Sequence, residues 1–293
     1  MGPGGLVIGG AFVAIWASAF TVAGVVVREW PPLWSLAIRF GCTAPILLLI
    51  ALAFRSRLPS RPDAARVALL GLFGMGGYLA LAWLAMARIP TGLVALICAT
   101  TPLLIAAGES AILKKPLPPL AWAGLAIGWS GVALLGGLRA LDGLEAAEAS
   151  GFVLAIGAAA AQAVGLLIYA PAKGRVDMWA ASLGQTAVSA LLCLLLALLL
   201  EGAMPRSASW FTLGGLFWSM IVVGIGGYAL YFVMLRRVPT STASALQLLA
   251  PPLAAVFGWA LLGERLYVSD VVGGLLTLGG LALLLRARAH ARG

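Results

Sequence analysis

The chain has 293 residues, of which 62% are hydrophobic and 10% are charged. Soluble domains average about 25% charged residues, so this composition excludes a soluble globular protein. The net charge of +9 comes from short basic clusters between apolar stretches, a pattern typical of loops facing anionic lipid rather than of a nucleic-acid-binding surface. Cys42, Cys98 and Cys193 lie in apolar stretches without C-x-x-C spacing, which predicts packing residues rather than disulfides or a metal site.

Apolar stretches long enough to cross a bilayer follow one another along almost the whole chain. A bilayer core needs about 20 apolar residues per helix, and the first stretch is too long for a signal-peptide core and lacks a basic leader. We therefore predict an all-α integral membrane protein with ten transmembrane helices, near residues 5–27, 32–54, 64–87, 91–113, 118–138, 150–170, 178–200, 210–235, 241–262 and 267–286.

Lysine and arginine are concentrated at alternate connections, and this bias predicts the orientation. They gather near 55–66, 114–115, 173–175, 236–237 and 286–292, and are sparser on the opposite side. Basic residues favour the cytoplasmic side, so both termini are predicted to be cytoplasmic. We divide the chain into a first repeat (1–138), a non-cytoplasmic connecting loop (139–149), a second repeat (150–286) and a basic cytoplasmic tail (287–293).

Two short motifs occur once in each half. GMGGY at 74–78 returns as GIGGY at 224–228, and RIPT at 88–91 returns as RVPT at 237–240. Because each half holds five helices, an odd number, the second copy must be inverted relative to the first. Inverted repeats are typical of secondary transporters, whose two near-equivalent halves can rock about a site at the membrane midplane.

Several local patterns resemble one family. They are IWASAFTVAG (15–24), the pair Arg39-Phe40, PTGLVALICATTPLLIA (90–106) and, above all, PTSTASALQLLAPPLAAVFGWALLGERL (239–266). With these residues the chain resembles the ten-helix EamA-like members of the drug/metabolite transporter (DMT) superfamily, and the resemblance covers essentially the whole chain. It implies an exporter of amino acids or related metabolites. The LLGE turn occurs once, since the first repeat has Lys114-Lys115 where the second has Glu264-Arg265.

Arg39 and Glu109 are the two ionisable residues that lie clearly inside predicted spans, where charge is costly. The guanidinium of Arg39 either anchors an anionic group of the substrate or is structural, tied to helix-end carbonyls, to Glu29 or to the interface. Glu109 either serves proton coupling or a cytoplasmic gate, or pairs with Lys114 or Lys115.

Polar and aromatic side chains near mid-span supply the other candidates. Small-molecule pockets combine apolar walls with a few placed polar groups. Gln162 and Gln247 are the sharpest candidates because an amide in hydrocarbon needs a partner, although helix–helix hydrogen bonding would also explain them, and core packing would explain Trp16. The predicted substrate-binding residues are Trp16, Ser18, Arg39, Tyr78, Thr100, Gln162, Tyr228, Ser244 and Gln247.

Pro102 and Pro251 fall near mid-span in corresponding helices of the two halves. A proline frees the carbonyl one turn earlier and bends its helix. Interrupted helices at matching positions are the best sequence indication of a transporter's central site. We therefore predict that these prolines bend the gating helices, and that helices 1, 3, 4, 6, 8 and 9 line a central cavity.

These observations predict a secondary active transporter of the cell inner (plasma) membrane. It would export a small carboxylate-bearing metabolite, such as an amino acid or its derivative, by alternating access around a midplane cavity. Its partners would be that substrate and the lipid bilayer, with a proton as candidate coupling ion, and with no cofactor, metal or nucleic acid; it would be a monomer or a homodimer. The alternative is an uncoupled channel or lipid scramblase, with a multidrug exporter ranked behind. An enzyme is not expected, because the aspartates flank the spans and the lone histidine is His290.

Overall fold

The computed structural model describes residues 3–111, 114, 116–141, 146–227, 230, 233, 246–265 and 267–290. In this part of the chain the regular secondary structure consists of helices, without strands. Eight helices are long and apolar enough to cross a membrane, and two shorter apolar helices, Pro119–Leu135 and Ala250–Leu262, occupy the places of the fifth and ninth predicted spans. The prediction of an all-α membrane protein is therefore confirmed.

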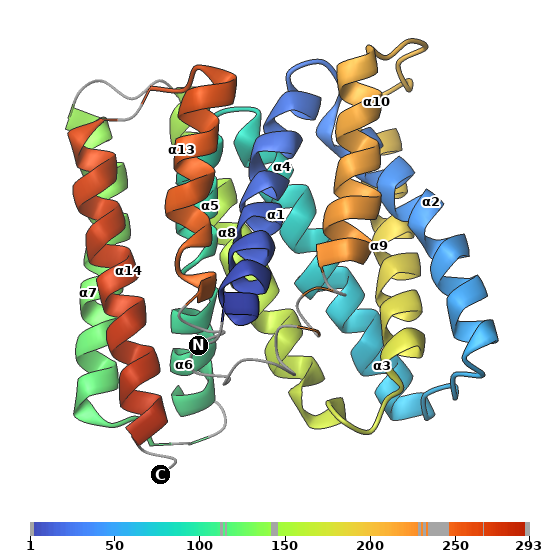
Figure 1. Ribbon diagram of the computed structural model, residues 1–293, viewed down its shortest axis with the longest axis horizontal. Coiled ribbons are helices and arrows are strands. Elements are labelled where there is room, and N and C mark those ends of the chain that lie inside the picture. The colour runs from blue at the N-terminus through green and yellow to red at the C-terminus, as the bar shows by residue number, and fades with distance from the viewer. Residues whose placement is uncertain are drawn as a thin grey trace.

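In the first half, five crossings run between the two ends of the molecule (Figure 1). The third crossing contains a π-helical segment and the fourth is interrupted. The elements are α1 (Pro3–Val27), α2 (Pro32–Ala53), α3 (Arg61–Leu69) with η1 (Leu70–Gly77) and α4 (Tyr78–Met86), α5 (Thr91–Cys98) with α6 (Thr101–Ala111), and α7 (Pro119–Leu141).

The second half repeats this order. Its elements are α8 (Ala146–Tyr169) with the short η2 (Ala170–Ala172), α9 (Met178–Leu200), α10 (Trp210–Phe217) with η3 (Trp218–Gly227), α13 (Ala250–Leu262) and α14 (Val268–His290). Local signals fix several of the ends. The Asp177 carboxylate accepts from Trp179 N at the start of α9, Ser209 Oγ accepts from Thr212 N at the start of α10, and Gly263, at φ 66°, ends α13 in the left-handed conformation.

The connections lie at two ends, which we call upper and lower as they appear in Figure 1. The upper end contains residues 28–31, 87–90, 201–209 and 263–265, and the lower end contains 54–60, 116–118 and 173–177. The N-terminal end of α1 and the C-terminal end of α14 both point towards the lower end. That this end is cytoplasmic stays a prediction from the basic residues.

The two π-helical segments occupy equivalent places in the two halves, over the glycine motifs that repeat in the sequence. η1 contains GMGG and η3 contains GIGG. A π turn tightens the approach to the carbonyl five residues back, and a Cβ on Gly77 would lie 2.7 Å from the oxygen of Leu72. Glycine therefore permits the turn, and π-helical turns are frequent at functional sites.

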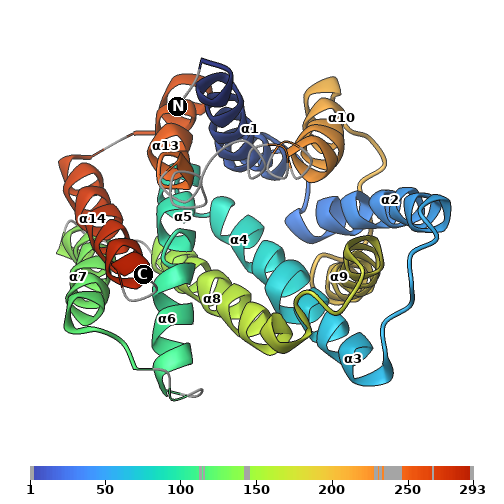
Figure 2. The same cartoon turned by 60° about the horizontal axis from the view of Figure 1, so that its bottom comes forward.

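Most helices pack chiefly against helices of the other repeat (Figure 2). α2 lies along α9, α1 along α13, α5 against α13, and η1 against both α8 and α9. At the opposite edge from α2 and α9, α7 and α14 form a close pair in which a Cβ on Gly280 would lie 2.3 Å from the nitrogen of Gly128. The repeats are thus interleaved, and bodies that move past one another would take helices from both.

Candidate functional site

The fourth crossing is broken in the middle of the molecule. α5 ends at Cys98, Ala99 and Thr100 form a turn, and α6 begins at Thr101. Because Pro102 has no N–H, the Cys98 carbonyl loses its helical donor. The Thr101 hydroxyl replaces that donor at 2.8 Å, while the Thr100 hydroxyl donates to the Ile97 carbonyl at 2.6 Å. The break is thus closed by local threonine bonds.

The ninth crossing is interrupted at the matching place. Residues 246–247 are helical, Leu248 and Leu249 form a turn, and α13 then begins at Ala250 with Pro251 in its first turn. Leu249 N donates to the Leu246 carbonyl at 3.0 Å. Gln247 is exposed just before the turn. An amide at this depth is costly to place in hydrocarbon, so its position favours an opening lined with water or substrate.

Three crossings bring polar side chains together at the first break. Gln162 from α8 lies with its Oε1 2.8 Å from Thr101 Oγ1. Tyr78, at the junction of η1 and α4, is hydrogen bonded to Cys98. The structure therefore joins the predicted residues Tyr78, Thr100 and Gln162 around one helix break. For Gln162 it also shows the helix–helix hydrogen bond that was the alternative interpretation.

The predicted residues of α1 face the second repeat. Ser18 Oγ accepts from Trp218 Nε1 of η3 at 3.0 Å and donates to the Ile15 carbonyl. Trp16 stacks obliquely on Phe12, with ring centroids 5.5 Å apart, and packs beside Ala250 at the start of α13. Trp16 is thus partly a packing residue, and the segment that it packs against includes the second helix break.

Arg39 lies in α2 and Glu109 in α6. Arg39 is half-buried in α2, with its guanidinium 5.6 Å from the centre of the Phe40 ring and close enough to Cys193 of α9 to act on it electrostatically. Glu109 is half-buried near the lower end of α6. Tyr228 and Ser244 fall outside the described residues.

Two residues of the region were not on the predicted list of binding residues. Thr101, rather than its neighbour Thr100, makes the bond to α8, and Trp218 bonds to Ser18. The sequence offers two adjacent threonines, and only the rotation of α6 against α8 distinguishes them. Trp218 follows a span start by eight residues, in a segment whose π-helical rotation the sequence pattern does not show.

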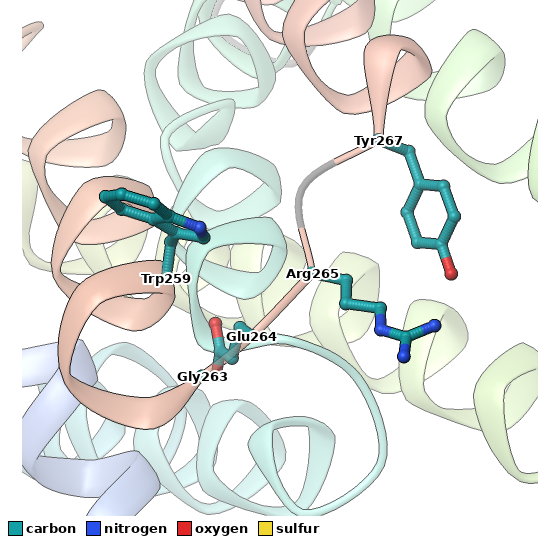
Figure 3. A pocket seen from close by; sticks show the side chains of 5 residues that line it. All are labelled: Trp259, Gly263, Glu264, Arg265 and Tyr267. Atoms are coloured by element: carbon teal, nitrogen blue, oxygen red, sulfur yellow. The ribbon is translucent and has the colours of Figure 1, made fainter.

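Two cavities open at the upper end, on either side of Glu264. One, of about 410 Å³, is lined by Trp259, Gly263, Glu264, Arg265 and Tyr267 (Figure 3). The other, of about 400 Å³, lies between the ends of α1, α4 and α5 and includes Arg28, Arg88, Thr91 and Glu264. Neither lies at the helix breaks. In Figure 3, Arg265 and Tyr267 extend to one side of the turn and Trp259 stands on α13 at the other.

A model of the EamA-like transporter family matches residues 4–137 and again residues 149–286. The chain belongs to the EamA-like transporter family. Both matched segments hold one π-helical segment and one interrupted crossing, so the unusual features recur once per family unit. Membership makes the chain a membrane transporter rather than an enzyme.

Curated relatives agree with that assignment, and a solved structure shares the fold. The chain is 29% identical to the uncharacterized inner membrane transporter YedA of Escherichia coli K12, over 87% of this chain and 82% of the relative. It is 28% identical to a probable amino-acid metabolite efflux pump of Salmonella typhimurium, over 92% of this chain and 90% of the relative. A crystal structure with 20% identity matches with a TM-score of 0.62 over 97% of this chain and 99% of the other, which shows a shared fold.

Proposed function

We propose that this protein is a secondary active exporter of the inner membrane that moves a small carboxylate-bearing metabolite by alternating access. The observation that carries the proposal is the pair of interrupted crossings, one per repeat, at 99–100 and 248–249. Transporter sites form at such interruptions, where backbone groups and polar side chains are available at the midplane.

The chemistry around the breaks suits an amino-acid-like substrate. Hydroxyl and amide groups of Thr101, Gln162 and Gln247 offer both donors and acceptors, and Trp16 and Trp218 offer apolar walls. Arg39 supplies a cation on α2 that would attract a carboxylate during passage. One relative is named a probable amino-acid metabolite efflux pump, and this name supports the same substrate class.

The interleaved packing changes how the motion is pictured. The sequence suggested that the first repeat rocks against the second, but α2 and α9 belong to different repeats and pack along their lengths, as do α1 and α13. We therefore propose that α2, η1, α8 and α9 form one body, and that α1, α5 and α13 change their packing both against this body and against one another. The first break contacts α8 of this body through α5 and α6.

The experiment is efflux from proteoliposomes loaded with a mixed pool of amino acids and small organic acids, read by mass spectrometry. We expect selective and saturable release of one carboxylate-bearing class, and loss of that release in Gln247→Ala with normal protein yield. Unsaturable release of many compounds would instead indicate a channel or scramblase. A dependence on an imposed pH gradient would assign proton coupling, with Glu109 as the first residue to replace.

A further inference from the structure

The N-terminus of α5 is held by a carboxylate from the other repeat. Glu264, just past the end of α13, accepts from Thr91 N at 2.9 Å through Oε1 and from Thr91 Oγ1 at 3.0 Å through Oε2. The first N–H groups of a helix have no partner inside the helix and carry its positive dipole end. Because the carboxylate is charged, this cap is stronger than an ordinary hydroxyl cap.

The helices leave room for this contact by using glycine. A Cβ on Gly258 of α13 would lie 2.3 Å from Glu264 Oε2, and a Cβ on Gly24 of α1 would lie 2.4 Å from the methyl carbon of Thr91. The ends of α1, α5 and α13 therefore converge on the pair Thr91–Glu264. The three helices are thus in close contact at this point of the upper end.

A second layer of contact lies one turn below the cap. Ala17 of α1, Ala95 of α5 and Ala254 of α13 form a fully buried cluster. Thr21 lies on the same face of α1, since it follows Ala17 by four residues and precedes Gly24 by three. Its side chain is 3% exposed, and its hydroxyl has no hydrogen-bond partner within the described part of the chain.

A buried hydroxyl without a partner costs free energy, so its place in the closed seam needs a reason. If α1, α5 and α13 separate, Thr21 reaches water and the cost disappears. The hydroxyl is therefore suited to a surface that opens during the transport cycle. This observation is independent of the Glu264 cap and concerns the same three helices.

The lower end does not have the matching acid. Matching the repeats at the LLGE pattern sets Lys114-Lys115 against Glu264-Arg265. The register that aligns RIPT (88–91) with RVPT (237–240) is shifted by one residue and places Lys114 opposite Gly263 and Lys115 opposite Glu264. The backbone supports this register, because Lys114 has φ 51° and Gly263 has φ 66°, both left-handed. An ammonium group has no acceptor, so it cannot cap a helix N-terminus as a carboxylate does.

We propose that Glu264 is a one-sided latch that closes the upper gate, and that the lysine at the equivalent position of the lower end biases the resting transporter towards the state in which the upper gate is shut. The proposal rests on the proposed alternating-access function. Release of substrate at the upper end then requires Glu264 to leave Thr91, while the equivalent position at the other end carries a lysine in place of the acid.

The test uses Ala95→Cys as a reporter in a chain whose Cys42, Cys98 and Cys193 are replaced by alanine. Ala95 is 1% exposed beneath the latch. A membrane-impermeant methanethiosulfonate is added to spheroplasts, which present the predicted non-cytoplasmic face. Labelling should be slow in the reporter alone. Glu264→Gln, which keeps the size and removes the charge, should raise the labelling rate by about tenfold, since a bond to a charged group is being replaced by a weaker neutral one.

Three further variants sharpen the test. Gly258→Ala should raise labelling as Glu264→Gln does, because the new methyl group displaces the carboxylate. Lys115→Glu should also raise it, by providing the missing acid at the opposite end and so favouring the state with the upper gate open. The matched control is Glu148→Gln, the same change in the first turn of α8 at the same end, and it should leave the rate unchanged.

The latch is wrong if neither Glu264→Gln nor Lys115→Glu changes the labelling rate while the reporter chain still shows saturable efflux in proteoliposomes. Lys115→Glu keeps this test available even if changes at the packed Gly258 prevent folding. If labelling responds as predicted and no substrate is carried in a saturable way, the gate stands and the exporter proposal fails.

Discussion

Arg175 and Asp63 face each other across the two repeats at the lower end, with Arg175 Nη2 2.6 Å from Asp63 Oδ1. The same junction at the upper end joins Glu29 to Ser209, whose N–H donates to the Glu29 carboxylate at 2.8 Å. Ser60 and Asp63 take the places of Ser209 and Thr212 in the repeat register. The inverted repeat thus preserves the position of this contact and exchanges the side that carries the acid. At the lower end the acid is Asp63 in the first turn of α3, and at the upper end it is Glu29 in the loop between α1 and α2.

The geometry of the Asp63–Arg175 ion pair predicts that replacing Asp63 and replacing Arg175 destabilise the protein to different extents. The Asp63 side chain is 10% exposed and also accepts from Arg66 and Ser60, whereas the Arg175 side chain is 57% exposed. Asp63→Ala should lower the melting temperature more than Arg175→Ala does, because several donors lose their acceptor. Arg175→Ala should cost below about 1 kcal/mol, as exposed ion pairs do. Thermal unfolding in detergent would measure both, and equal losses would contradict the assignment.

Gly165 of α8 approaches η1 so closely that a Cβ on it would lie 2.3 Å from the nitrogen of Gly74. Gly165→Ala should therefore destabilise the protein by at least about 1–3 kcal/mol through overpacking against backbone. The matched control is Gly157→Ala on the same helix, where the nearest atom, Leu81 Cδ1, is 3.6 Å away. That variant should be neutral or stabilising. If both variants unfold at the same temperature, the helices can separate at this crossing without cost.

The spans, the internal repeat and the interrupted helices follow from local pattern, and the sequence predicted them well. The apolar period sets where helices run, and Pro102 and Pro251 mark where they are interrupted. What the pattern could not show is which polar groups form hydrogen bonds with one another. Glu264 appeared as one of several loop acids, and its partner Thr91 is 173 residues away.

The same limit applies to the candidate site. Gln162 was singled out as an amide that needs a partner, but the sequence did not distinguish a pocket from a helix–helix bond. That choice depends on the rotation of α8 relative to the break at 99–100. Arg39 stood out because charge is rare in a span, although rarity alone does not say which helix it faces. Its proximity to Cys193 of α9 became visible only with the packing of α2 along α9.

Thr101 and Gln162 should behave as one unit. Thr101→Val takes away the hydroxyl that the Gln162 amide contacts, and Gln162→Leu takes away that amide, whereas the double variant removes both groups. The summed effect of the single changes on the free energy of unfolding should exceed that of the double variant by about 1 kcal/mol. A double-mutant cycle by thermal unfolding measures this coupling. Additive changes would show that the 2.8 Å contact contributes no energy to the fold.

Arg39→Gln should raise the KM for a carboxylate-bearing substrate by about tenfold or more, because the fork of guanidinium donors is lost. Arg39→Lys keeps the charge and should recover part of that affinity. Initial rates of efflux at several substrate concentrations give KM and maximal rate separately. A variant that expresses well with wild-type kinetics would limit Arg39 to the packing of α2 on α9.

Glu29, at the upper end, makes a contribution to the stability of the fold that depends on pH. Hydrogen bonds from the Ser209 side chain, then from Thr212 and the Ser209 N–H, hold its pKa below the ordinary value of 4.5. A lowered pKa contributes stability that is present above the unfolded value and is lost as the pH falls through the folded one. The melting-temperature difference between wild type and Glu29→Gln should therefore stay constant from about pH 7 to 5 and shrink below 4.5. If the difference in melting temperature disappears already near neutral pH, the Glu29 carboxylate is not stabilised by these hydrogen bonds.

The most direct test of alternating access around the two helix breaks is exchange in proteoliposomes. Labelled substrate is held inside, and unlabelled substrate is added outside at increasing concentration. Because a carrier returns faster with substrate bound than empty, efflux of label should accelerate and then saturate, and Gln247→Ala should abolish the acceleration. Efflux that rises linearly with the gradient and ignores the outside substrate would show an uncoupled pore, and would contradict the central claim.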